Sequence, residues 1–129
     1  MQDYIDFYQK YKDIANIYIV YILEAHFVEK DENQNIIGGW PIGKQYNYPQ
    51  HKSINDRYNM VNLLIDEFHP NIPILMDNMN NDFQNIYNPW PDKAFMFFQN
   101  KIKYISQVND DGSRYLSWTT EISTILDKF

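Results

Sequence analysis

The chain has 129 residues, the length of one domain, and its 44% hydrophobic and 17% aromatic content excludes a disordered protein. Its 17 Asp and Glu residues outnumber 11 Lys and Arg residues, and the resulting net charge of −6 makes nucleic acids and anionic membranes poor partners. No apolar run reaches the roughly 20 residues of a membrane-spanning helix, and no signal peptide opens the chain. The sequence is therefore interpreted as that of a soluble, cytoplasmic protein.

The first part of the chain is predicted to form a helix and then a strand. Apolar residues recur at helical spacing over residues 4–14, so the chain is expected to open inside a helix. The apolar, β-branched run Ile17–Leu23 predicts a strand buried on both faces, as in a parallel sheet. Residues 24–50 show no clear period, and residues 29–35 are interpreted as a solvated loop tip.

A second helix is predicted to begin at Ser53, because Asp56 follows at the spacing of a capping box. The helix is expected to end at residues 69–71, where a proline stops it. Its apolar face is predicted to consist of Tyr58, Val61, Ile65 and Phe68. A second buried strand is predicted over Ile72–Met76, followed by a short helix over Asp82–Tyr87.

The last part of the chain predicts a hairpin and a closing helix. Strands Ala94–Phe98 and Ile102–Ser106 are separated by three turn residues, and residues 110–112 form a further turn. The aromatic residue before Pro91 makes a cis peptide bond more plausible there. Ser117 is predicted to cap a final helix. The inward face of that helix is predicted to carry Trp118, Ile122, Ile125 and Phe129.

The order of these elements predicts an α/β protein with a mixed sheet flanked by helices. It is the order of a thioredoxin-like domain, α-β-α-β-(α)-β-β-α, with the first, central strand missing. Residues 1–129 are accordingly predicted to form a single domain that is incomplete at its N-terminus. Because neighbours of a missing central strand would keep unpaired backbone groups, such a chain is expected to be marginally stable, rearranged or completed by another segment.

Polar residues follow the first predicted strand, at the sheet edge where open α/β sheets bind ligands. Glu24 and His26 are two residues apart, so on a strand they would point the same way and form a proton-transfer pair. The alternative is a pair of solvated side chains at a strand end. His51, in a loop entering a helix, is interpreted either as an anion site or as an exposed residue. Trp40 either holds a substrate ring or anchors its loop.

A metal site is a further alternative at these residues. Zinc bound by His26, His51 and Glu24 is left open, although these residues lack the short ligand spacing of zinc motifs. The expectation is that the chain holds no metal and no cofactor. Zero cysteines exclude disulfides, thiolate ligands and a thiol nucleophile among these residues.

Five segments in order give the chain a resemblance to the iodothyronine deiodinase family, running from the first helix to Phe129. The string Val20–His26 is the most specific of them, because it contains Tyr-Ile followed by Glu-Ala-His. The others are Gly39–Trp40, Pro49–His51 with Asp56–Arg57, Ile72–Asn81 and Tyr87–Lys93.

The resemblance implies a thioredoxin-like oxidoreductase that removes iodine reductively from iodothyronines and related halogenated phenols. It implies a selenocysteine or cysteine nucleophile upstream of these residues and a thiol reductant as co-substrate. Tyr21, Glu24 and His26 match residues with a hydrogen-bonding and proton-delivery role. His51 matches a histidine that holds the far end of the substrate, and Arg57 and Trp40 are assigned to the substrate site with it.

The sequence also departs from the family pattern. A polar insertion over residues 29–37 separates Glu-Ala-His from Gly-Trp, and residues 106–112 replace a glycine-rich turn that bears a substrate-binding arginine, with Arg114 nearby but out of register. A selenocysteine codon read as a stop upstream would explain the missing nucleophile. Alternatives are an inactive binding or regulatory module and a relative of peroxiredoxin-like thiol peroxidases. A homodimer and a membrane anchor upstream, as in full-length relatives, are left open.

Overall fold

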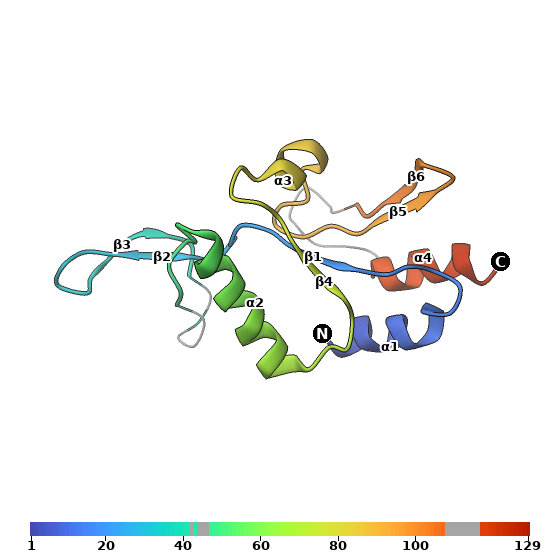
Figure 1. The fold of residues 1–129 in the computed structure, drawn as a ribbon, viewed down its shortest axis with the longest axis horizontal. Coiled ribbons are helices and arrows are strands. Elements are labelled where there is room, and N and C mark those ends of the chain that lie inside the picture. The colour runs from blue at the N-terminus through green and yellow to red at the C-terminus, as the bar shows by residue number, and fades with distance from the viewer. Residues whose placement is uncertain (42, 44–46, 108–116) are drawn as a thin grey trace. The chain divides into compact units, whose positions relative to one another are not determined.

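Helices and short strands alternate along the computed structural model, which describes residues 1–41, 43, 47–107 and 117–129 (Figure 1). In chain order the elements are α1 (Gln2–Tyr11), β1 (Ile19–Tyr21), β2 (Val28–Lys30), β3 (Ile36–Gly39), α2 (Ile54–Phe68), β4 (Ile74–Met76), α3 (Asp82–Tyr87), β5 (Phe95–Phe98), β6 (Lys101–Ile105) and α4 (Trp118–Leu126). This order confirms the α/β class and is consistent with a thioredoxin-like domain. The predicted turn at residues 110–112 lies outside the described residues.

The chain divides into two compact units, one of residues 1–18, 70–73 and 92–129 and the other of residues 19–69 and 74–91. In the first unit α1 lies beside α4 (Figure 1). Their buried side chains are Phe7, Tyr11, Ile122 and Leu126. The prediction that Phe129 faces inward is wrong, since it is 70% exposed. Because α4 ends at Leu126, Phe129 lies beyond the helical face, and Leu126 is buried instead.

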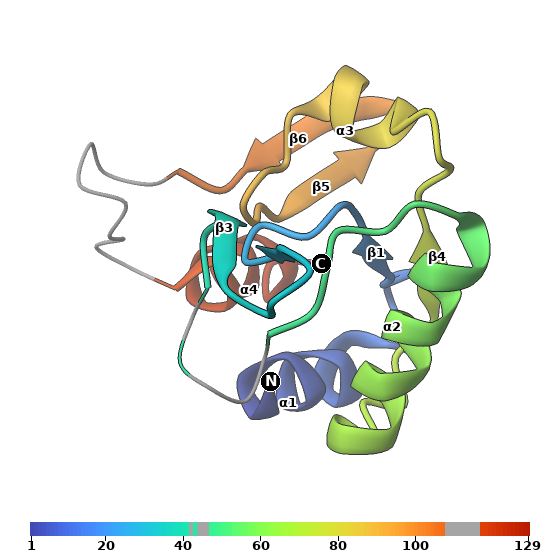
Figure 2. The same ribbon diagram turned by 90° about the vertical axis from the view of Figure 1, so that its left-hand side faces the viewer.

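The predicted hairpin of the first unit is confirmed: β5 begins one residue later than predicted and ends at the predicted Phe98, and β6 lies one residue earlier than predicted. Strands β5 and β6 pair antiparallel, from Phe95 opposite Ile105 to Phe98 opposite Lys101, and are the two orange arrows in Figure 2. The two turn residues, Gln99 and Asn100, have positive φ angles of 50° and 61°, which suit the twist of a two-residue hairpin.

In the second unit β1 pairs with β4 in parallel, as the first apolar run predicts, with Ile19 opposite Ile74 and Tyr21 opposite Met76. The prediction that both strands are buried on both faces is wrong. The three β1 residues are half-buried, and Leu75 of β4 is 51% exposed. Among the described residues this sheet has two strands, so each of them is an edge strand with one side that no neighbouring strand covers.

A second hairpin occupies the stretch without clear period, where the sequence predicts no strand. Val28 of β2 lies opposite Gly39 of β3, with an irregularity after Glu29. Residues 29 and 30 of the predicted loop tip belong to β2, and the Asp31 carboxylate that follows accepts hydrogen bonds from the backbone N–H groups of Asn33 and Asn35 at 2.8 and 2.9 Å. The tip is therefore a turn ordered by one aspartate.

The capping box at the start of α2 is confirmed. Ser53 Oγ accepts from Asp56 N at 3.1 Å, and Asp56 Oδ2 accepts from Ser53 N at 2.9 Å. His69 ends the helix with a left-handed φ of 43°. The predicted apolar face is wrong except for Val61, because the helix buries Val61 together with Arg57. The residues of that face that remain exposed are Tyr58, Ile65 and Phe68.

The remaining predicted elements are also present in the structure. The short helix α3 has the predicted bounds, and the Trp90–Pro91 peptide bond is cis. Ser117 caps α4 by accepting from Thr119 N at 3.4 Å. Within the described residues, no helix is both long and apolar enough to cross a membrane.

Candidate functional site

The candidate site of the second unit centres on the carboxylate of Glu24, three residues after β1. The hydroxyl of Tyr21, the last residue of β1, donates a hydrogen bond to Glu24 Oε1. Gln50 holds the backbone of Glu24 from both sides, since its Oε1 accepts from Glu24 N at 3.0 Å and its Nε2 donates to Glu24 O at 2.9 Å. The Glu24 side chain is therefore held in place while 24% of its surface remains exposed.

His51 lies against the same carboxylate. Its side chain is 1% exposed, and its Nε2 is 3.7 Å from Glu24 Oε1. Among the described residues Nε2 has no hydrogen-bond partner. The imidazole ring is 5.7 Å from the ring of Tyr21 between centroids. Tyr21, Glu24 and His51 thus form a cluster in which a buried nitrogen is just beyond hydrogen-bonding distance of a carboxylate, a separation typical of catalytic groups without substrate.

Arg57 of α2 binds His51 through the ring nitrogen that does not face Glu24. Its Nε donates to His51 Nδ1 at 3.1 Å. Its terminal nitrogens donate to Asp77 O at 2.8 Å, Asn78 O at 2.7 Å and Asn81 Oδ1 at 2.9 Å. The side chain is 1% exposed, and burial lowers the pKa of the guanidinium while the Asp77 charge acts in the opposite direction. The resemblance assigns Arg57 to substrate binding, whereas in the structure its guanidinium is bound to His51, Asp77 O and Asn81.

Asp77, directly after β4, is buried and orients the segment that faces Arg57. Its carboxylate accepts from the backbone N–H groups of Asn78, Phe83 and Gln84 at 2.9 to 3.0 Å. Two of these groups belong to the first turn of α3, where an acidic side chain satisfies free N–H groups and complements the helix dipole. Asp77 therefore fixes the carbonyl groups that receive the Arg57 guanidinium.

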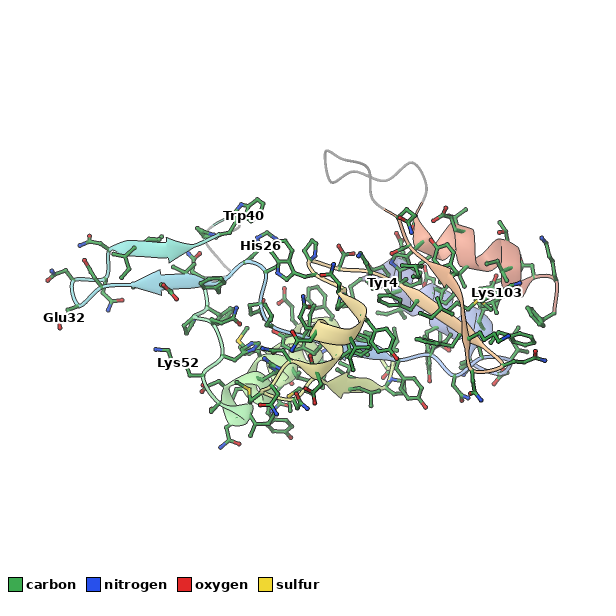
Figure 3. The ribbon with its side chains drawn as sticks, turned by 90° about the horizontal axis from the view of Figure 1, so that it is seen from above. Tyr4, His26, Glu32, Trp40, Lys52 and Lys103 are labelled. Carbon is green, nitrogen blue, oxygen red and sulfur yellow. The ribbon has the colours of Figure 1, made fainter. Side chains whose placement is uncertain are left out.

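The expectation that His26 and Glu24 point the same way from one strand is wrong. Strand β1 ends at Tyr21, and the alternation that would place residues 24 and 26 on one side does not continue. His26 Nδ1 instead donates to Trp40 O at 2.9 Å, and the two rings meet edge to face at 5.7 Å. Figure 3 shows this pair at the open end of the β2–β3 hairpin, with Glu32 at its tip.

Trp40 directly follows β3 and is 63% exposed. Its ring centroid is 6.5 Å from that of Trp90, which is also exposed. The backbone N–H of Trp40 donates to Phe27 O at 3.0 Å. An indole held at its backbone but exposed at its ring provides a flat apolar surface for an aromatic ligand.

The metal alternative receives no support from the geometry. Over residues 1–41, 43, 47–107 and 117–129, no three His, Asp or Glu side chains converge as metal ligands. Glu24 and His51 lie together, whereas His26 is bound to Trp40 O. Arg114 lies outside the described residues.

Three residues that position the site were not assigned a role from the sequence: Gln50, Asp77 and Asn81. All three fall inside segments of the family resemblance. Their location within those segments is the sequence signal that could have identified them. Side-chain type alone does not distinguish an amide that holds another group from one in solvent, and the partners of Gln50 and Asn81 lie 26 and 24 residues away in sequence.

The model of the iodothyronine deiodinase family matches residues 1–129. Similar curated proteins are thyroxine 5-deiodinases from Sparus aurata (26% identity over 106 residues, 81% of this chain and 36% of the relative), Gallus gallus (26% over 118, 91% and 40%) and Bos taurus (25% over 121, 93% and 36%). The chain spans at most about two fifths of the length of these relatives. Since the match covers every residue, the chain belongs to the iodothyronine deiodinase family.

Proposed function

We propose that this chain forms part of a reductive dehalogenase that removes iodine from an iodinated phenol. Family membership and relatives named thyroxine 5-deiodinase support this proposal. The observation that carries it is the buried Nε2 of His51, which faces the Glu24 carboxylate at 3.7 Å beside the Tyr21 hydroxyl. Replacing iodine by hydrogen on a ring carbon requires a proton donor, and these three side chains make a proton path.

The reaction balances with a selenolate or thiolate as nucleophile. The nucleophile bonds to iodine as the carbon–iodine bond breaks, and the ring carbon takes a proton. Two thiols of a reductant then reduce the selenium–iodine or sulfur–iodine bond, which releases iodide and gives a disulfide. Because the chain contains no cysteine, we assign the nucleophile to a residue outside these 129, on a segment that would precede α1.

In this scheme Tyr21, Glu24 and His51 deliver the proton, and the exposed Trp40 ring stacks on the substrate. His26 stands next to Trp40, held by the Trp40 carbonyl, and is assigned to the aromatic subsite. Every residue of the predicted site has a role in this scheme, but the residues fall into separate groups. One group handles the proton, the other contacts the ring, and Arg57 supports His51.

The test is iodide release from an iodinated phenol with a dithiol present. The protein would be the chain extended upstream with its native codons, with cysteine at any in-frame TGA, compared with the 129-residue chain. We expect release from the extended protein alone. Random upstream sequence, or an extended protein that folds by circular dichroism but releases no iodide, would contradict the proposal.

The first variant to compare is Glu24→Gln in the extended protein, with Glu32→Gln at the hairpin tip as the matched control. Loss of a group that transfers a proton typically lowers kcat by about 10²–10⁴-fold. We expect that loss for Glu24→Gln and an unchanged kcat for Glu32→Gln. Equal rates for both variants would show that Glu24 handles no proton in the slow step.

A further inference from the structure

The hydrogen-bond partner of His51 Nδ1 determines which form of the imidazole is present. That partner is Arg57 Nε, at 3.1 Å in the interior of the second unit. An arginine guanidinium has donors and no acceptor, so Nδ1 must hold its lone pair toward Arg57. A neutral imidazole then carries its hydrogen on Nε2, the atom that faces Glu24 Oε1 at 3.7 Å.

We infer that Arg57 is a positioning residue that locks His51 in the tautomer protonated at Nε2. The guanidinium cannot turn away, because its terminal nitrogens are held by Asp77 O, Asn78 O and Asn81 Oδ1. These acceptors fix the plane of the guanidinium, and with it the direction of the Nε–H bond. A lysine at this position would retain the charge but not that geometry.

His26 provides an internal reference with the opposite tautomer. Its Nδ1 is 2.9 Å from Trp40 O. A carbonyl oxygen accepts and cannot donate, so His26 Nδ1 carries the hydrogen and its Nε2 holds the lone pair. Two histidines of one unit are therefore fixed in opposite tautomers by a donor in one case and an acceptor in the other.

For catalysis, this inference rests on the proposed function. With Nε2 protonated, His51 presents a hydrogen-bond donor to the Glu24 carboxylate, which also accepts from the Tyr21 hydroxyl. With Nδ1 protonated, two donors would face each other at Arg57, and a lone pair would face the carboxylate. Arg57 therefore selects the tautomer in which His51 is a hydrogen-bond donor toward Glu24.

The experiment measures ring nitrogens of the 129-residue chain by long-range proton–nitrogen correlation spectra, with His51→Asn and His26→Asn variants to assign the signals. We expect His51 to show an unprotonated Nδ1 and a protonated Nε2, and His26 to show the reverse. A His51 ring protonated at Nδ1, or averaged between both tautomers, would overturn the inference without any assay of activity.

Two variants distinguish a role of Arg57 in positioning His51 from a role in stabilising the fold. Arg57→Lys should shift both His51 nitrogen signals toward values averaged over the two tautomers, while leaving the His26 signals unchanged. Asn59→Lys is the matched control, because it introduces the same side chain at an exposed position of the same helix. It should leave the His51 signals unchanged. Unchanged His51 signals in a folded Arg57→Lys variant would overturn the inference.

The extended protein adds a kinetic readout. Misplacement of a proton donor typically costs about 10²-fold in rate, so Arg57→Lys should lower kcat by that factor. In the His51→Asn background the same substitution should have little further effect, because it acts through His51. Full additivity would overturn the inference. Absence of iodide release from every form would contradict the proposed function and leave the tautomer result intact.

Discussion

Single residues set the hydrogen-bond directions at the site. Each acts through a group that can only donate or only accept a hydrogen bond. Arginine can only donate and a backbone carbonyl can only accept, so His51 and His26 are oriented without a second ionisable group at Nδ1. Gln50 uses both ends of its amide on the backbone of Glu24. The polar groups that touch the candidate proton path are therefore positioned mainly by neutral or fixed-charge neighbours.

Gly39 is a second position where one residue type is required. It has φ of +97°, and a Cβ there would lie 2.1 Å from Phe27 O. That oxygen accepts the hydrogen bond from Trp40 N. A side chain at position 39 would thus displace the backbone that holds Trp40 beside His26.

We expect Gly39→Ala to open the end of the β2–β3 hairpin, at a cost of at least about 1–2 kcal/mol from the left-handed backbone alone. The measurement is hydrogen exchange at the Trp40 amide, which should lose roughly tenfold or more in protection. Gly38→Ala is the control, since a Cβ at position 38 would come closest to Glu29 Oε2, the far end of a flexible side chain, at 2.8 Å. Equal protection in both variants would contradict the close approach at Phe27.

Secondary-structure elements with a local signal were predicted from the sequence. The capping box at Ser53 predicted the start of α2, and its end at His69, the bounds of α3 and the β5–β6 hairpin follow from similar signals. The β2–β3 hairpin was missed because its strands have three and four residues and no apolar alternation. The buried face of α2 was predicted incorrectly because Arg57 is buried by polar partners distant in sequence.

At the site, local patterns located residues but not their neighbours. Glu24 and His26 were expected together from strand alternation, which β1 does not continue beyond Tyr21. His51 approaches Glu24 because Gln50 binds the Glu24 backbone across 26 residues of chain. Such a contact depends on tertiary structure, and the sequence carries no local periodicity that would indicate it.

The capping box of α2 gives a prediction at the scale of an element. We expect Ser53→Ala to lower the free energy of unfolding by about 1 kcal/mol, because the Asp56 amide loses its acceptor. Urea unfolding followed by circular dichroism would measure this loss. Ser53→Asn, which retains a capping oxygen, should stay close to wild type. A Ser53→Ala protein as stable as wild type would show that the cap contributes nothing measurable.

At the scale of the whole molecule, the two units are stabilised by different kinds of buried residue. The first unit buries aromatic and aliphatic side chains, mainly Phe7, Tyr11, Ile122 and Leu126. The second buries His51, Arg57 and Asp77 beside Val28 and Val61. Most polar atoms of these three side chains are hydrogen-bonded, which offsets the cost of burying them. The candidate site and the structural centre of the second unit are thus largely the same residues.

The first unit also carries a pH-dependent contact between α1 and the residue after α4. The Tyr11 hydroxyl donates to Asp127 Oδ1 at 2.6 Å and Lys10 Nζ at 3.0 Å. First the Tyr11 hydrogen bond and then that of Lys10 lower the pKa of Asp127 below its ordinary value of 3.8. A carboxyl with a lowered pKa stabilises the fold above its unfolded pKa, and that contribution is lost as pH falls through the folded pKa.

We therefore expect Asp127→Asn to be less stable than wild type at pH 7, and the difference to narrow as pH falls below 3.8. Thermal unfolding of both proteins across this pH range is the measurement. Asp13→Asn, at an exposed position of the same unit, is the control for loss of a negative charge. A difference that stays constant with pH would indicate that Asp127 acts by packing and not by its charge.

The parallel pairing of β1 with β4 has a consequence for the time course of folding. Helices and hairpins form from near neighbours in the chain, whereas β1 and β4 are separated by the β2–β3 hairpin and α2. Closing that long segment costs chain entropy before any strand contact offsets it. Tyr21 and Asp77 meet at the end of this pair, where Asp77 N donates to Tyr21 O at 2.9 Å. We therefore expect Asp77, which fixes the carbonyl groups that bind Arg57, to reach Tyr21 late, after the local elements have formed.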